Sequence, residues 1–214
     1  MRNFVFYAFA LGILMGCAES KNTSSTSLEG EKYVELRFAE GPLKGKHRFT
    51  KVKGKLTGGV GVHYNDTTEK SPQMRNTFTL SANNLVSDAP QFKLSYFTIV
   101  GKGEVTQGVH NAVAFTNSDG LEYCVNLNLQ GTHDQLGFFE LHTKKSSYSD
   151  LKIQTLSPWE EKTIHQTQSV KGEFDTEVTL IIRDAQGNDI ERVQTTLRVS
   201  FLADHKKLKD QNQS

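Results

Sequence analysis

Ten residues in the middle of the chain alternate strictly between two kinds of side chain. The odd positions from 121 to 129 hold bulky apolar residues, and the even positions from 122 to 130 hold Glu, Cys, Asn, Asn and Gln. Successive side chains of a β-strand point to opposite faces of its sheet, whereas an amphipathic helix needs a period near 3.6 residues. This period of two therefore predicts a strand with one buried face and one solvated face.

The same period recurs through most of the chain after residue 32. Clusters rich in Asn, Asp, Ser and Gly separate the runs, for example at 117–120, 131–134 and 184–188, and such clusters favour tight turns. Short strands with close turns favour antiparallel pairing, so we predict an all-β fold of the antiparallel sandwich or jelly-roll type. The predicted strands are residues 33–38, 47–52, 56–64, 76–80, 91–100, 110–115, 121–130, 136–142, 150–156, 177–183 and 190–202.

At most one short helix is predicted. Ser157 is a good N-cap, Pro158 suits the first helical position and Glu160 completes a capping box, which indicates a helix near 158–165. The 214 residues suffice for one large domain, whereas a second sandwich after Gly131 would be shorter than the usual size of about 100 residues. We therefore expect a single β-rich domain over 31–203, followed by a polar tail over 204–214.

Composition excludes several classes of protein. The chain carries 25 Lys+Arg against 24 Asp+Glu, and this balance argues against a strongly basic nucleic-acid binder, so no nucleic-acid partner is expected. Its 2 cysteines are too few for a disulfide scaffold. The sequence also lacks the run of about 18 apolar residues that a transmembrane helix needs.

The first seventeen residues have the layout of a secretory signal peptide. A cation at Arg2 precedes a mostly apolar run over 4–15, and the small residue Gly16 precedes Cys17. A charged start, a short apolar stretch and a small residue before the cleavage site are typical of such peptides. The ending Leu14-Met15-Gly16-Cys17 resembles the lipobox of bacterial lipoproteins.

That resemblance implies a lipid anchor. Residues 1–16 would be removed as the signal peptide, Cys17 would carry a diacylglycerol on its sulfur, and the new amino group could then be acylated. The membrane would be a partner through this anchor. In such lipoproteins an aspartate directly after the cysteine is a signal for retention in the inner membrane. This position holds Ala18, which favours the outer membrane. Residues 18–30 are small and polar except for Leu28, so we expect 17–30 to be the lipidated cysteine and a flexible tether.

A run of cations over 44–55 contains no acidic residue. On a strand it could offer a positive strip to anionic lipid headgroups, to phosphate or to an acidic glycan. Lysines also protect exposed edge strands against aggregation, which is the alternative interpretation. The candidate basic patch consists of Lys44, Lys46, Arg48, Lys51, Lys53 and Lys55.

The polar side of the 121–130 run is a second candidate surface. A flat polar sheet face with nearby aromatics such as Tyr96 or Trp159 resembles the binding face of many β-sandwich carbohydrate-binding modules. A solvated outer face has the same composition, and Cys124 would lie on it as a dispensable thiol. The residues of this possible ligand-binding face are Glu122, Asn126, Asn128 and Gln130.

No motif for catalysis, a metal or a cofactor stands out, so none of the three is assigned to any residue. The 7 histidines lack zinc-ligand spacing, and the chain has no nucleophile elbow, phosphate loop or dinucleotide fingerprint. Two carboxyls of a glycosidase, which lie about 5–9.5 Å apart, cannot be paired from sequence.

The sequence thus favours a cell-envelope lipoprotein whose domain binds or scaffolds without catalysis, with a glycan, an envelope component or an envelope protein as partner. The alternative is an envelope polysaccharide hydrolase or lyase on the same scaffold. A third class is a closed sheet around an apolar ligand, as in lipocalins, and it would need an enclosed apolar cavity. The chain does not resemble that family, because its tryptophan, Trp159, lacks the sequence context of the lipocalin tryptophan.

Overall fold

The computed structural model describes residues 28, 30–55, 57–65, 76–87, 92–116, 122–133, 137–143 and 150–208. Every regular element in these ranges is a β-strand, which confirms the predicted all-β fold. The expected signal peptide, Cys17 and most of the tether lie outside the described residues. The strands are β1 (Tyr33–Phe38), β2 (Gly45–Lys51), β3 (Gly59–Asn65), β4 (Thr77–Ser87), β5 (Phe92–Lys102), β6 (Gly108–His110), β7 (Phe115–Thr116), β8 (Glu122–Tyr123), β9 (Val125–His133), β10 (Gly137–Thr143), β11 (Leu151–Leu156), β12 (Glu160–Glu161), β13 (His165–Arg183) and β14 (Asp189–Leu208).

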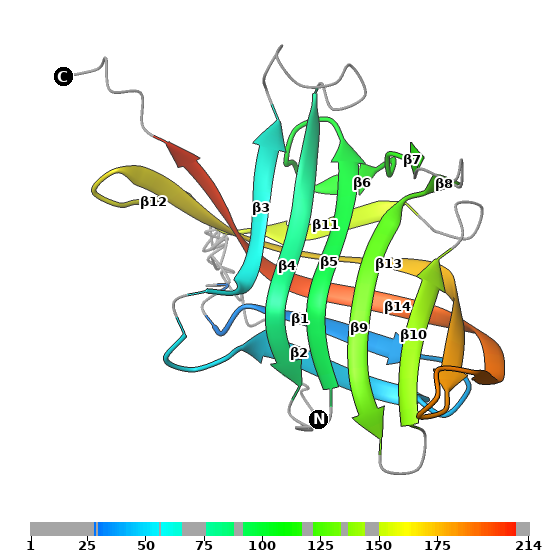
Figure 1. The fold of residues 1–214 in the computed structure, drawn as a ribbon. Coiled ribbons are helices and arrows are strands. Elements are labelled where there is room, and N and C mark those ends of the chain that lie inside the picture. Colours follow the sequence, from blue (N-terminus) through cyan, green and yellow to red (C-terminus); the bar gives the residue numbers. More distant parts are fainter. Residues whose placement is uncertain are drawn as a thin grey trace, which may run out of the picture.

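Twelve strands form one sheet that folds over on itself into two layers (Figure 1). Neighbours follow the order β2-β1-β14-β3-β4-β5-β9-β10-β13-β11-β6, β12 pairs with β13, and β2 also pairs with β4. In Figure 1, β3, β4, β5, β9 and β10 form the front layer and cross β1, β2, β13 and β14 behind them. The pairing is antiparallel except where β14 meets β3. Crossing layers of this kind are sandwich-like, as predicted.

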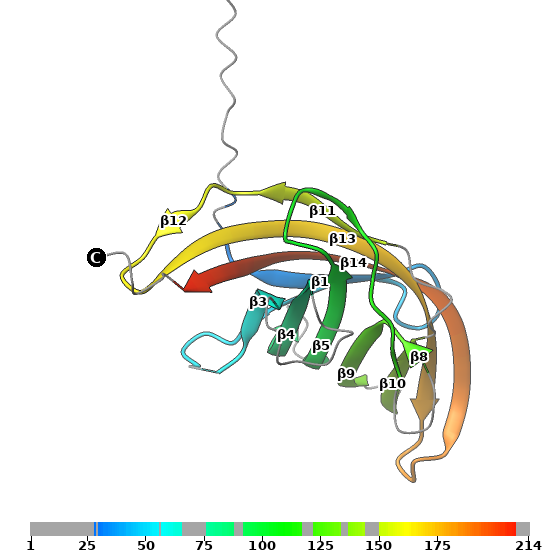
Figure 2. The same cartoon turned by 90° about the horizontal axis from the view of Figure 1, so that it is seen from above.

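A long hairpin connects the two layers. β13 has 19 residues and β14 has 20, and both curve around the molecule in Figure 2. The sequence predicted only 177–183 and 190–202, because the buried positions of β13 before residue 177 include Gln168, Gly172 and Thr176, which hide the apolar alternation. β14 also continues through Leu208, so residues 204–208 belong to the sheet and not to the expected tail.

One hydrophobic core lies between the layers. Its buried residues come from segments between Val34 and Ala203. Phe97 of β5 and Phe174 of β13 stack across it, with ring centroids 6.1 Å apart and planes 18° apart. Burial of such aromatic rings is the main source of stability for a chain in which no disulfide is described.

The segment predicted to be a short helix is extended. Glu160 and Glu161 form β12, which pairs with Gln166 and Thr167 of β13. The Ser157 hydroxyl accepts a hydrogen bond from the Ser169 backbone N–H at 2.9 Å, so its capping oxygen serves a strand. Pairing with β13 offers this segment backbone partners that outweigh a weak, Thr-rich helix.

Cys124 is buried, which corrects its expected place on the polar face. Its residue is 1% exposed, and it interrupts the predicted strand: β8 pairs with β7 in a separate two-stranded sheet, and β9 starts at Val125. Among the residues of this run whose burial is described, buried and exposed positions alternate from Val125 to Leu129.

Cys124→Ser is therefore expected to lower the free energy of unfolding by about 1–3 kcal/mol, because a hydroxyl is costlier to bury than a thiol. Urea unfolding of the variant measures this loss. Cys124→Ala, which buries no new polar group, is the control. Equal midpoints for wild type and Cys124→Ser would contradict the buried placement.

Candidate functional site

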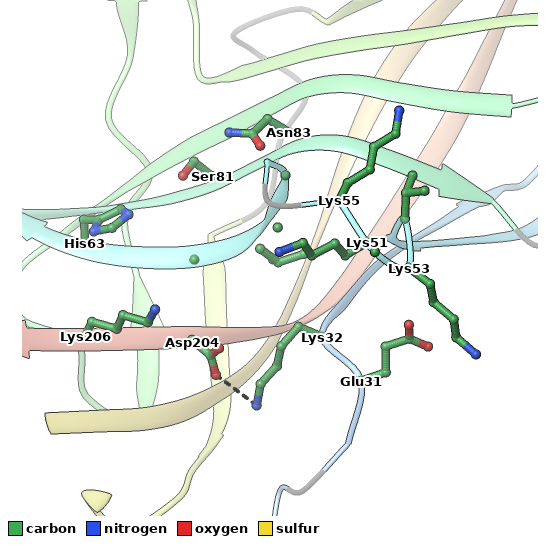
Figure 3. Close-up of a pocket in the computed structure, with 16 residues that line it drawn as sticks. Glu31, Lys32, Lys51, Lys53, Lys55, His63, Ser81, Asn83, Asp204 and Lys206 are labelled. Carbon is green, nitrogen blue, oxygen red and sulfur yellow. Dashed lines mark ion pairs between the residues drawn. The ribbon is translucent and has the colours of Figure 1, made fainter. Parts of the chain in front are cut away.

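A hollow lined by lysines opens where β2, β3, β4 and β14 come together (Figure 3). Its volume is about 710 Å³, and we call it the lysine groove. In Figure 3, Lys51 and Lys206 point toward its centre, while Lys53 and Lys55 lie at its rim and point outward. Its lining residues are Glu31, Lys32, Lys51, Val52, Lys53, Gly54, Lys55, Gly58, Gly59, Val60, Gly61, His63, Ser81, Asn83, Asp204 and Lys206.

Glycines leave room for the groove at the start of β3. Gly58 has a φ of +99°, and a Cβ there would come within 3.1 Å of the backbone oxygens of Asn83 and Asn84. Only glycine adopts that conformation without strain while approaching β4 so closely. Gly59 and Gly61 carry no side chain over the lining, so a ligand can approach the backbone of β3.

The groove is positive. Five lysines and two carboxylates line it. One of the carboxylates is already paired, since Asp204 Oδ1 lies 3.1 Å from Lys32 Nζ. The Lys32 ammonium also donates a hydrogen bond to Ser169 Oγ, which ties the segment before β1 to the β13–β14 hairpin. The other lysines leave an excess of positive charge that suits an anion.

Polar rows extend from the groove across the outer face of the front layer. In one row the strand register pairs Gly61 with Ser81, Ser81 with Thr98, and Thr98 with Asn126. Cross-strand partners point to the same face of a sheet. The groove therefore continues into the part of the predicted ligand-binding face that contains Asn126.

A second row runs beside the first. It pairs Gly59 with Asn83, Asn83 with Tyr96, and Tyr96 with Asn128. The Tyr96 side chain is 41% exposed, and Asn83 and Asn128 are exposed as well. Tyrosine presents an apolar ring with a polar tip, so this row offers a stacking surface between hydrogen-bonding groups. We call the two rows together the polar face.

The structure divides the predicted basic patch. Lys51, Lys53 and Lys55 line the groove. Lys46 instead pairs with Glu35 at 2.9 Å, and the Arg48 guanidinium lies 3.9 Å from the centre of the Tyr33 ring. Lys44 is exposed and does not line the groove.

The predicted ligand-binding face is divided too. Asn126 and Asn128 are exposed on β9, and Gln130 lies on the same strand. Glu122 belongs to β8, outside the large sheet. The sequence did not identify Lys32, His63, Ser81, Asn83, Asp204 or Lys206 as site residues, because only strand pairing brings these separate segments together.

His205 lies behind the groove with its ring against Trp159. The two ring centroids are 5.0 Å apart, and Nδ1 of His205 is buried without a hydrogen-bond partner among the described residues. Burial lowers the pKa of His205 from 6.5 to about 4, with smaller contributions from His63 and Lys207. The ring is therefore neutral near pH 7.

This lowered pKa predicts a loss of stability in acid. The unfolded chain takes up the proton near pH 6.5 and the folded chain near pH 4, so the stabilisation is complete above about 6.5 and disappears as the pH falls toward 4. We expect a loss of about 1–2 kcal/mol over that range, a value reduced for partial solvent screening. Urea unfolding at several pH values measures it. The pH dependence should shrink in His205→Phe but persist in His165→Gln, and an unchanged profile in His205→Phe would contradict the assignment.

No group of three or more His, Cys, Asp or Glu side chains that could hold a metal ion occurs among the described residues. Within the same ranges, the structure contains no helix with the length and apolarity needed to cross a membrane. Comparisons with protein-family models, curated proteins and solved structures found no match to this chain.

Proposed function

We propose that the chain is a lipid-anchored protein of the bacterial cell envelope whose β-domain binds an anionic glycan without catalysis. The observation that carries the binding function is the continuity between the lysine groove and the polar face. The resemblance of Leu14-Met15-Gly16-Cys17 to a lipobox supports the anchor and an envelope location, with the outer membrane favoured.

The two parts of this surface suit different parts of a charged sugar chain. Hydroxyl and amide groups of Ser81, Asn83 and Asn126 can exchange hydrogen bonds with sugar hydroxyls. The exposed ring of Tyr96 can pack against the apolar face of a sugar ring. At one end of these rows the groove lysines can neutralise carboxylate, phosphate or sulfate groups.

Lysine chemistry indicates what kind of anion fits. All five cations that the structure describes in the groove lining are lysines. An ammonium acts as a point charge and does not impose the planar, bidentate geometry that arginine imposes on a single carboxylate. A cluster of such charges favours an anion with several negative groups over one isolated charge.

A non-catalytic function is favoured over a polysaccharide hydrolase or lyase. The groove contributes two carboxylates, Glu31 and Asp204, and Asp204 is held in an ion pair by Lys32. A glycosidase needs two carboxyls that both face the scissile bond, whereas the Asp204 carboxylate is engaged by Lys32. The proposal therefore assigns no step of bond cleavage to the groove.

A thermal-shift screen tests the proposal. The mature chain with Cys17→Ser is heated alone, with polygalacturonate, with a phosphorylated lipopolysaccharide core and with neutral dextran. A ligand at about 100 times its Kd adds about 2.7 kcal/mol of stability, which raises Tm by several degrees. We expect this shift with the anionic glycans and not with dextran.

Charge reversal locates the binding surface. Lys51→Glu combined with Lys206→Glu should abolish the shift, whereas Lys152→Glu, an exposed position on β11 outside the groove, should preserve it. A shift that survives the double variant would place binding elsewhere. Failure of all the anionic glycans would refute this ligand class and leave an envelope protein as the partner to test.

A further inference from the structure

A three-stranded ribbon of β12, β13 and β14 projects past the layered body at one end of the molecule (Figures 1 and 2). We propose that the end of this ribbon inserts into the interfacial region of the membrane that holds the Cys17 anchor. The inference rests on the lipid anchor of the proposed function and adds a second, protein-borne contact with the same bilayer. We call Trp159, Lys162, Ile164, Lys207 and Leu208 the ribbon end.

The ribbon end exposes large apolar side chains, although the Trp159 ring also packs on His205. Leu208 is 77% exposed and Ile164 is 69% exposed, and Trp159 is 39% exposed. The register pairs His165 with Leu208, so Ile164 and Leu208 lie at the tip of the ribbon together. Exposed apolar residues gathered at one tip indicate a contact surface more than scattered ones do.

Lysines accompany these apolar residues. Lys207 is exposed directly before Leu208. Lys162 lies in the turn that contains Ile164 and pairs with Glu160 at 3.0 Å. Tryptophan, long aliphatic side chains and lysines are the residues that proteins place at the surface of an anionic bilayer. Because Glu160 and Glu161 balance these lysines, the exposed apolar side chains and the nearby anchor favour the membrane, not a net charge.

The anchor would bring this tip to the bilayer. Lys32 contacts Ser169 and Asp204, which are four residues from the ribbon tip on β13 and β14. At about 3.3 Å per residue, the described chain thus enters the fold about 13 Å from the tip. Thirteen residues, 18–30, separate Cys17 from Glu31. Their composition predicts a flexible tether, and a coil of that length has a root-mean-square span of about 20 Å. The tip is therefore within reach of the bilayer that holds the anchor.

The opposite end of the same hairpin lacks this character. Ile190 is 64% exposed there, but Asp184, Asp189 and Glu191 surround the β13–β14 turn. This end of the hairpin is also far from the point where the chain enters the fold, since Lys32 contacts Ser169 and Asp204 near the other end of β13 and β14. Ile190 is therefore a matched control for Ile164 and Leu208.

Trp159 is the chain's only tryptophan, so its fluorescence reports on the ribbon end directly. The lipidated protein is purified from membranes and reconstituted into phosphatidylcholine–phosphatidylglycerol vesicles whose acyl chains carry bromine close to the headgroup. We expect a blue-shifted emission and strong quenching. Ile164→Ser combined with Leu208→Ser should lower the quenching at least about twofold, and Ile190→Ser should leave it unchanged. Equal quenching in the double variant, or none in wild type, would overturn the proposal.

Separate measurements distinguish failure of the lipid anchor or of glycan binding from failure of the ribbon end to insert. The mass of the N-terminal peptide reports lipidation of Cys17, and the thermal-shift screen reports glycan binding. If Cys17 proves unmodified, the anchor of the proposed function is refuted. Sedimentation of the unlipidated chain with phosphatidylglycerol vesicles then tests whether the ribbon end binds a membrane by itself. Binding that the Ile164→Ser and Leu208→Ser variant loses supports insertion, and equal binding in that variant overturns it.

Discussion

Substitution of Phe97 by alanine is expected to lower the free energy of unfolding by about 3–5 kcal/mol. The Phe97 ring is 0% exposed and stacks on Phe174 across the two layers. Its removal takes away apolar burial and leaves a cavity that the curved strands on both sides cannot close. Urea unfolding followed by far-ultraviolet circular dichroism measures the loss.

The adjacent residue is a control that also tests the function. Tyr96→Ala removes a ring of similar size from the opposite face of β5, where the side chain is 41% exposed. We expect its stability to remain within about 0.5 kcal/mol of wild type. The same variant should lose the thermal shift with anionic glycans. A large loss of stability in Tyr96→Ala, or a small one in Phe97→Ala, would contradict the placement of Phe97 on the buried face of β5 and of Tyr96 on its exposed face.

Gly172→Ala is expected to destabilise the protein by about 1–3 kcal/mol, because it overpacks the long hairpin. A Cβ at this position would lie 2.5 Å from Cζ of Phe201 and 2.7 Å from the backbone oxygen of Lys152. The Phe201 ring is buried and the Lys152 oxygen belongs to β11, so β14 and β11 would both have to move away from β13. Thermal or urea unfolding measures the effect.

Lys171→Ala, one residue away and exposed, is the matched control for Gly172→Ala. It leaves the backbone and the core unchanged and should alter stability by less than about 0.5 kcal/mol. An equal and small effect of both substitutions would mean that β11, β13 and β14 are not packed as closely as the structure has them.

Strand prediction succeeded where apolar residues mark the buried face. Tyr33–Phe38 was predicted with its observed bounds, and the alternation from Val125 to Leu129 is confirmed. Prediction was incomplete in β13, because buried Gln168, Gly172 and Thr176 do not look like core residues in sequence. Gly172 faces the Phe201 ring, and Gln168 donates a hydrogen bond to the backbone oxygen of Ser157. Only the tertiary packing shows that a small or a polar group fits at such positions.

The candidate site was foreseen only in fragments. Lys51, Lys53 and Lys55 were marked by their local density of charge, and Asn126 and Asn128 by their place on the polar side of a strand. Tyr96 was predicted as an aromatic near that face. Nothing local connects these groups with Asn83 or Lys206. Even the helix signal at Ser157 was misleading, since a capping side chain can serve a strand when a partner strand is close.

The all-β class, the turns and the strand faces follow from the sequence, because each depends on neighbours along the chain. The alternation determines which side chains of a strand are buried, and the turn residues determine where the chain reverses direction. The lysine groove, the polar face and the projecting ribbon depend on which strands pair and in what register. The parallel contact of β14 with β3 joins residue 204 to residue 61. Such pairing is decided by the packing of the whole core, which no local pattern contains.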